Sequence, residues 1–259
     1  MRPHAWWVAL VGGVGAAATT RNGEAEAAGA IVLFIADGKL EVLLPLYSPH
    51  WPPSTDLGWN DLGYRNAALR TPTIDALRNE SVSLADYYVQ QVCSPTRAAL
   101  LTARFPHRLG SFAVIHASEP MGVPLDVPML SNALSDAGFE SHLLGKWHVG
   151  MYRPELLPIN RGFRGSAFGY LCGSTSYWTH GNTESFCPGE ESLFLLDLTN
   201  GSVPALGEHG GRWNGTYDTE MYTGALQEIL QGGARNRSKR LFLYIAPNNV
   251  HTPLGAPGE

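Results

Sequence analysis

Apolar and polar positions along this chain predict strands and helices in turn. IVLFIA (Ile31 to Ala36) is apolar throughout, which is typical of a strand buried on both faces. LFLYIAP (Leu241 to Pro247) has the same character, and SHLLGKW (Ser141 to Trp147) reads as a shorter strand that leads into a glycine-flanked loop. Such strands, separated by helical segments, predict an α/β fold with a mostly parallel sheet sandwiched by helices.

The helical segments carry recognisable start and stop signals. Thr71 caps a helix whose first position is Pro72, and Gly138 is a natural stop for another. Four helices are expected, at residues 71–77, 94–104, 127–138 and 218–230.

The first residues are typical of a secretory signal. A short polar start precedes AWWVALVGGVGAAA (Ala5 to Ala18), and this run is shorter than the roughly 20 residues that span a membrane. We therefore expect a signal peptide and short leader over residues 1–28, and a mature chain over residues 29–259 without a membrane span. Four N-x-S/T glycosylation sequons agree with a secretory route to the lysosome or the extracellular space; they begin at Asn79, Asn200, Asn214 and Asn236.

The charge and the cysteine content limit the kinds of partner and chemistry expected of this protein. The net charge is −5 without a basic stripe, which argues against nucleic acid as the main partner. Cys172 and Cys187 can pair, which leaves Cys93 over. An odd cysteine in a secreted chain indicates intermolecular pairing or a special chemical role.

Several reactive side chains fall where the predicted strands end. Asp37 follows the first strand, Lys146 and His148 follow the second, and His251 follows the last. Cys93 precedes a helix N-terminus, which favours an anion. Because ligands gather beyond the carboxyl ends of parallel strands, this set predicts a metal-assisted site that stabilises an oxyanion.

Two motifs carry a family resemblance. VCSPTRAALLTAR (Val92 to Arg104) resembles the sulfatase signature Cys-x-Pro-x-Arg, and GKWHVG (Gly145 to Gly150) resembles the second sulfatase signature. DLGWNDLGYRN, GKWHVGMYRPELLPINRGF and FGYLCGSTSYWTH are similar to the arylsulfatase B (N-acetylgalactosamine-4-sulfatase) branch. The resemblance implies an alkaline-phosphatase/sulfatase-like fold and a sulfuric ester hydrolase that acts on sulfated, glycosaminoglycan-like sugars.

The resemblance also implies a role for each motif residue. Cys93 would be oxidised to formylglycine by the formylglycine-generating enzyme, and the hydrated aldehyde would be the nucleophile. Arg97 would hold its hydroxyls near the metal. Lys146 would bind sulfate, and His148 would bind the hydrate. His251 would contact sulfate or protonate the leaving oxygen.

The implied metal is calcium, with Asp37, Asp56 and the modified Cys93 among its ligands. In the family the two aspartates are adjacent, whereas here eighteen residues, Gly38 to Thr55, separate them. This insertion contains four prolines and an apolar patch, and its deletion restores IVLFIADDLGWNDLGY. We interpret it as a translated intron or a gene-model error, which sequencing of the transcript would test.

Other departures from the family pattern leave two alternatives open. Thr96 and Ala103 replace a serine and a glycine of the signature, and the family's later Asp-Asn-Gly segment and second sulfate-binding lysine have no counterpart before Glu259. We therefore expect a catalytic domain truncated before its C-terminal part, with little or no activity in these 259 residues alone. The alternatives are a phosphoesterase of the same superfamily and a catalytically incomplete secreted glycoprotein that binds sulfated glycans.

Overall fold

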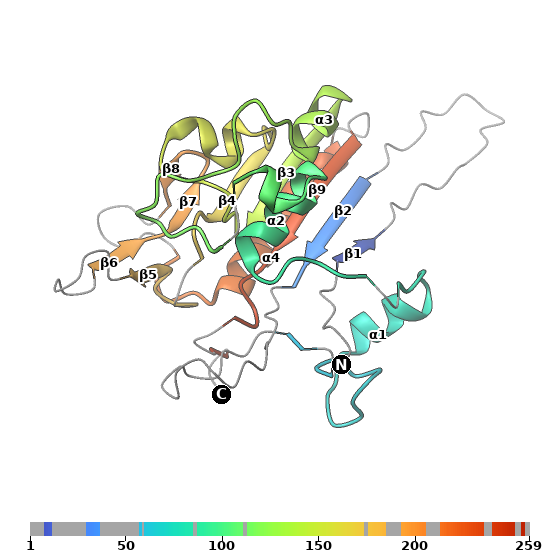
Figure 1. Ribbon diagram of the computed structural model, residues 1–259. Helices are drawn as coiled ribbons and strands as arrows, with labels where there is room; N and C mark the ends of the chain where they lie inside the picture. The colour runs from blue at the N-terminus through green and yellow to red at the C-terminus, as the bar shows by residue number, and fades with distance from the viewer. Residues whose placement is uncertain are drawn as a thin grey trace.

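The structure is a computed structural model of the chain, and it describes most of residues 57–256 together with two earlier segments (Figure 1). The described ranges are 8–11, 30–36, 57–58, 60–84, 87–110, 113–173, 176–184, 193–205, 213–235, 240–251 and 255–256. Asp37, Asp56 and the whole insertion lie outside these ranges, as do Cys187 and Asn236.

A seven-stranded sheet in the order β1-β2-β9-β3-β4-β7-β8 forms the centre of the fold. Its middle strands β2, β9, β3 and β4 run parallel, while β1 at one edge and β7 and β8 at the other are antiparallel. The strands are β1 (Val8–Val11), β2 (Ala30–Ile35), β3 (Phe139–Gly145), β4 (Ser166–Tyr170), β7 (Leu198–Asn200), β8 (Val203–Pro204) and β9 (Arg240–Ala246). The parallel centre confirms the fold class predicted from the apolar runs.

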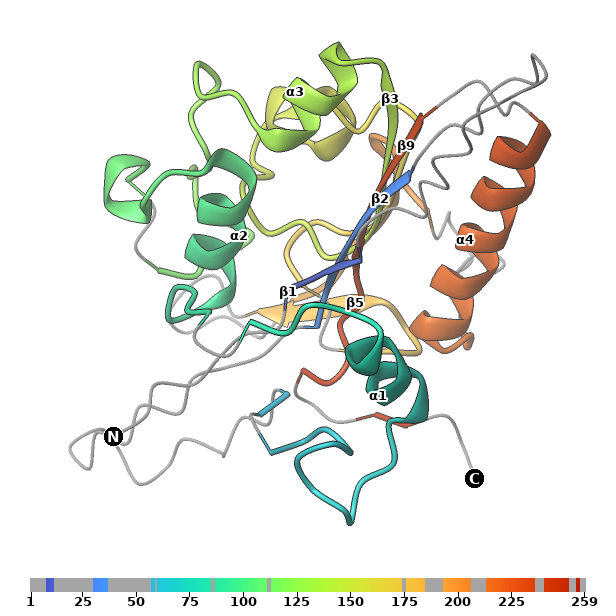
Figure 2. The ribbon, with the colours of Figure 1, turned by 90° about the vertical axis from the view of Figure 1, so that its right-hand side faces the viewer.

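Helices cover both faces of this sheet (Figure 2). α2 (Cys93–Thr102) and α3 (Leu130–Asp136) lie on one face, and α4 (Asp218–Arg235) lies on the other. α1 (Pro72–Asn79) is apart from both layers, and β5 (Gly181–Glu184) and β6 (Leu193–Leu196) form a separate two-stranded sheet. Short 3₁₀ turns complete the connections at Pro106–Arg108, Pro154–Leu156 and Pro158–Asn160.

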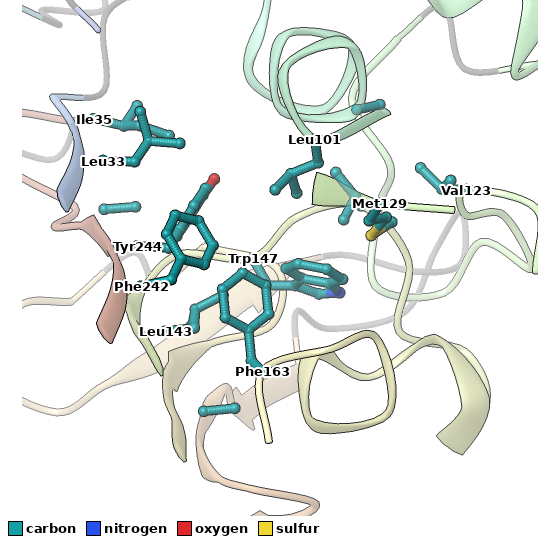
Figure 3. Packing of buried hydrophobic residues seen from close by; sticks show 14 of the residues in the cluster. Leu33, Ile35, Leu101, Val123, Met129, Leu143, Trp147, Phe163, Phe242 and Tyr244 are labelled. Atoms are coloured by element: carbon teal, nitrogen blue, oxygen red, sulfur yellow. The ribbon is translucent and has the colours of Figure 1, made fainter. Parts of the chain in front are cut away.

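Two apolar clusters, one on each face, hold the layers together. Neighbouring strand residues point to opposite faces, so Leu143 of β3 belongs to the cluster beneath α2 and α3 and Leu144 to the cluster beneath α4. Phe163 is central to the larger cluster, with its ring centroid 5.9 Å from Trp147 and 5.7 Å from Tyr244 (Figure 3). Trp147 thus anchors the segment that carries Lys146 and His148 to the core.

Some element boundaries differ from the sequence predictions. The helix expected over residues 127–138 is confined to Leu130–Asp136. Val127 ends a turn in which its N–H donates to the Pro124 carbonyl and its own carbonyl accepts from Arg161, and Met129 is extended. The last helix continues to Arg235, beyond the expected Leu230.

β1 lies inside the predicted leader. It pairs with β2 over four residues, from Val8 opposite Ile35 to Val11 opposite Val32. Cleavage of residues 1–28 would remove this strand and leave β2 at the sheet edge, so the signal peptide stays a prediction. Within the part of the chain that the structure describes, no helix combines the length and apolarity needed to cross a membrane.

Candidate active site

Cys93 is the first residue of α2, and local hydrogen bonds fix the start of this helix. The Thr96 hydroxyl donates to the Val92 carbonyl at 2.7 Å, and the Ser94 hydroxyl accepts from the Ile115 N–H at 3.0 Å. Val92 is extended and makes no side-chain cap. Cys93, a free thiol with 9% of its surface exposed, therefore lies at a helix N-terminus whose dipole favours negative charge.

Arg97 lies one helical turn after Cys93, on the same face of α2. Its side chain is 1% exposed, and Nη1 donates to the Lys146 carbonyl at 2.7 Å and lies 3.4 Å from the Tyr244 hydroxyl. The guanidinium thus joins the start of α2 to the ends of β3 and β9, which brings Cys93 and Arg97 to the lysine–histidine motif.

Lys146 directly follows β3 and is almost fully buried. Its N–H donates to the Ala246 carbonyl at 2.8 Å, so β3 and β9 end at the same level. Gly145 makes this approach possible: its φ is +109°, and a Cβ there would lie 2.0 Å from the Ala246 oxygen. The backbone at Gly145 therefore excludes a residue with a Cβ.

His148 adopts a left-handed backbone conformation with a φ of 60°. Its N–H donates to the Leu171 carbonyl at 2.9 Å, and its Nε2 lies 3.0 Å from the Ile115 carbonyl. Because a carbonyl only accepts, Nε2 carries a hydrogen and Nδ1 is the nitrogen that gains or loses a proton. A non-glycine residue in this conformation costs about 1–3 kcal/mol, a strain that clusters at functional sites.

His251 is half-buried on the loop after β9. Its N–H donates to the Asn248 carbonyl at 2.7 Å, and the Tyr177 hydroxyl donates to the carbonyls of His251 and Asn248. This loop begins beside Lys146, since β3 and β9 end together. The structure thus joins Arg97, one turn after Cys93 in α2, to Lys146 by a direct hydrogen bond, and places His251 on a loop from the same sheet edge.

The described residues do not test the calcium site, since Asp37 and Asp56 both lie outside them. Among the residues that are described, no group of three or more His, Cys, Asp or Glu side chains could hold a metal ion. Calcium therefore stays a prediction.

The glycosylation sites and the disulfide also stay predictions. Asn79, Asn200 and Asn214 are exposed, as glycosylation requires, while Asn236 is outside the described residues. Cys172 is buried, and the structure does not test its pairing with Cys187, which is likewise outside.

Sequence reasoning missed two polar residues of this region. Tyr244, in the middle of the last apolar strand, presents its hydroxyl to Arg97. Asp197, between β6 and β7, accepts hydrogen bonds from the N–H groups of residues 171–173. The available signal was an aspartate directly after the apolar run LFLL, the same pattern that singled out Asp37.

Burial shifts the protonation of three nearby side chains. Burial raises the pKa of Asp197, whereas the hydrogen bonds from Gly173 and Cys172 and the charge of His148 lower it. It raises the pKa of Asp218 to about 7. It lowers the pKa of His180, whose ring is 2.7 Å from the Tyr170 hydroxyl and 2.9 Å from the Trp213 carbonyl. For Asp197, the three peptide N–H groups stabilise the ionised carboxylate against this cost of burial.

A cysteine at a helix N-terminus, together with a buried arginine and a buried lysine at the carboxyl edge of a parallel sheet, defines an α/β protein whose site suits an anionic ligand. The Sulfatase family model matches residues 54–259, and this chain belongs to that family.

Curated relatives share sequence over most of the described chain. Mouse (Mus musculus) arylsulfatase J is 38% identical over 208 residues, which cover 79% of this chain and 32% of the relative. Human (Homo sapiens) arylsulfatase A is 31% identical, covering 76% of this chain and 40% of the relative. Human N-acetylgalactosamine-6-sulfatase is 37% identical over a shorter stretch, 42% of this chain and 22% of the relative. The chain thus spans well under half the length of these proteins.

Solved structures agree with the fold. Ps i-CgsB superposes with a TM-score of 0.63 at 30% identity, over 78% of this chain and 44% of that protein. The same protein in complex with k-i-k-neocarrahexaose gives a TM-score of 0.64 over the same shares. The similarity therefore extends from the motifs to the arrangement of the strands and helices.

Proposed function

We propose that this chain contributes the nucleophile-bearing part of a calcium-dependent sulfatase of the arylsulfatase B type, which removes sulfate from sulfated sugars. The observation that carries the proposal is the hydrogen bond from Arg97 to the Lys146 carbonyl, because it joins the two sulfatase motifs in one buried site. Membership of the family supports the reaction class.

Each described side chain has a task that its surroundings support. The N-terminus of α2 and the Lys146 ammonium supply positive charge for the sulfate oxygens. Arg97, one helical turn after Cys93, is fixed by its contact with the Lys146 carbonyl and does not have to reorganise. His148 holds or moves a proton at Nδ1, because its Nε2 is committed to the Ile115 carbonyl. His251 protonates the leaving oxygen.

Two groups beyond the unmodified chain complete the proposal. Oxidation of Cys93 to formylglycine would supply a hydroxyl nucleophile for attack at sulfur. Calcium would supply positive charge at the sulfate, with Asp37, Asp56 and the modified Cys93 as proposed ligands. The secretory leader and the exposed sequons support maturation in the endoplasmic reticulum by the formylglycine-generating enzyme, followed by a lysosomal or extracellular location.

The substrate class is inferred from the relatives. One relative is named N-acetylgalactosamine-6-sulfatase, and a structural neighbour was solved in complex with k-i-k-neocarrahexaose, which supports a sugar substrate here too. The sequence of the second motif and its surroundings resembles the N-acetylgalactosamine-4-sulfatase branch, which favours the 4-sulfate.

A cell-based experiment tests the proposal. The full-length protein is expressed with the formylglycine-generating enzyme, and the peptide around Cys93 is analysed by mass spectrometry for the aldehyde. Activity is assayed on an aryl sulfate, on an aryl phosphate, and on matched 4-sulfated and 6-sulfated N-acetylgalactosamine disaccharides. We expect the aldehyde, hydrolysis of the aryl sulfate, and preference for the 4-sulfated sugar.

Matched variants separate the alternatives. Cys93→Ala should abolish turnover, whereas Thr96→Ser, which restores the residue of the family signature, should keep it. Preference for the phosphate would support a phosphoesterase instead. Glycan binding by an unmodified, inactive protein would support the non-catalytic glycoprotein, and turnover of the 6-sulfate alone would refute the arylsulfatase B type.

A further inference from the structure

Asp197 is a buried carboxylate that the family motifs do not include. It lies between the last residue of β6 and the first residue of β7, with 8% of its surface exposed. Oδ1 accepts from the Leu171 N–H at 3.1 Å and the Cys172 N–H at 3.0 Å, and Oδ2 accepts from the Gly173 N–H at 2.7 Å. One side chain thus binds three consecutive peptide groups that follow β4.

The peptide segment that Asp197 binds is in contact with Lys146 and His148 of the second motif. The Leu171 carbonyl accepts the N–H of His148 at 2.9 Å, and the Cys172 Sγ lies 3.7 Å from His148 Nε2. Gly173 packs against the Lys146 side chain so closely that a Cβ at this position would be 2.9 Å from Cε and 3.1 Å from Nζ. Movement of this segment would therefore displace the lysine and the histidine together.

Only a carboxylate satisfies this arrangement. Three N–H donors converge on the two oxygens of Asp197, and an ionised carboxylate is the side chain that accepts at both ends and donates at neither. Asparagine has the same shape but would direct an NH₂ group at one set of peptide N–H groups. A buried carboxylate is costly unless it is hydrogen-bonded, and here the bonds go to the segment that supports the site.

We infer that Asp197 is a positioning residue, which holds Lys146 and His148 in place for the sulfate ester through the segment Leu171–Gly173. The inference rests on the proposed function. A misplacement of about 1 Å in a catalytic group can cost about a hundredfold in rate, so the supporting contacts matter as much as the groups themselves.

The test compares Asp197→Asn and Asp197→Ala with Thr199→Val in the full-length, formylglycine-bearing protein. Thr199 lies on β7, two residues after Asp197. Its hydroxyl donates to the Gly169 carbonyl at 3.2 Å, away from residues 171–173. The control thus removes a hydrogen bond between β7 and β4 and leaves the peptide segment in place. Three quantities are measured for these three variants and the wild type: amide hydrogen exchange of residues 171–173, kcat and KM for an aryl sulfate, and inhibition by inorganic sulfate.

We expect at least tenfold faster exchange of these amides in Asp197→Asn, a larger effect in Asp197→Ala, and none in the control. We also expect kcat to fall at least tenfold in Asp197→Asn, with weaker inhibition by sulfate, while Thr199→Val stays within twofold of the wild type. Unchanged exchange, or faster exchange with kcat equal to that of the control, would overturn the positioning role alone. An inactive wild-type protein with a formed aldehyde would instead overturn the proposed function.

Discussion

Asp218 offers a quantitative test of the buried polar groups behind the site. It is the first residue of α4, is fully buried, and has a hydrogen bond from the Thr219 hydroxyl at 3.2 Å. Burial raises its pKa from 3.8 to about 7, which the Thr219 contacts only partly oppose. The folded protein therefore binds this proton more tightly than the unfolded chain does. The stability that results is fully present below pH 3.8 and is lost as the pH rises through about 7.

The expected size of this effect follows from the two pKa values. One pKa unit corresponds to about 1.36 kcal/mol, so a rise of about 3 corresponds to about 4 kcal/mol of unfolding free energy. Asp218→Asn keeps the shape and the neutral state at every pH. The variant should match the wild type near pH 4 and become more stable than it by up to about 4 kcal/mol near pH 8.

Urea unfolding of both proteins between pH 4 and pH 8, followed by tryptophan fluorescence, measures this difference. Glu220→Gln is the matched control, because Glu220 is an exposed carboxylate on the same helical turn and its loss should leave the pH profile close to that of the wild type. A stability difference between Asp218→Asn and the wild type that does not change with pH would refute the reasoning.

Three further predictions concern backbone and loop contacts. Gly145→Ala should cost about 2–4 kcal/mol of unfolding free energy because its Cβ would meet a β9 carbonyl, whereas Gly224→Ala, in open space on α4, should gain about 0.5–1 kcal/mol in the same urea titration. Tyr177→Phe removes the donor to the His251 loop and should lower kcat more than it changes KM, which steady-state kinetics on an aryl sulfate would show; kinetics equal to those of the wild type would contradict a positioning role for this hydrogen bond. Deletion of residues 38–55 should tighten calcium binding in isothermal titration calorimetry, and unchanged affinity would count against a split aspartate pair.

The sequence was sufficient for the elements whose pattern is local. β2 and β9 consist almost wholly of apolar residues, and β3 ends with the apolar pair Leu143 and Leu144. The sequence predicts each strand to within two residues of its start. The sequence predicts a helix from Ser94 with Pro95 near its first turn, and in the structure this helix begins one residue earlier, at Cys93.

The parts that could not be predicted depend on contacts far along the chain. Asp197 acts on amides 24 to 26 residues earlier, and no local pattern marks the partner of a buried carboxylate. β7 has three residues and β8 has two, too few for any periodicity to be read. The left-handed backbone of His148 follows from its bond to Leu171, which forms only when β4 lies beside β3.

The place of β2 in the sheet bears on the interrupted aspartate pair. The family match begins at residue 54, yet β2 lies before it and pairs in parallel register with β9, from Ala30 opposite Leu241 to Phe34 opposite Ile245. Residues 30–35 are therefore part of the same sheet as the matched region, and the unmatched stretch between them contains all but the last two residues of the insertion. Since β2 ends at Ile35, two residues before Asp37, and β9 leads into the His251 loop, Asp37 follows a strand whose neighbour supplies a proposed catalytic residue. On the proposed assignment of Asp37 and Asp56 as calcium ligands, the insertion directly after Asp37 separates the two ligands although β2 and β9 are already in register, as the interpretation of the insertion as foreign sequence predicts.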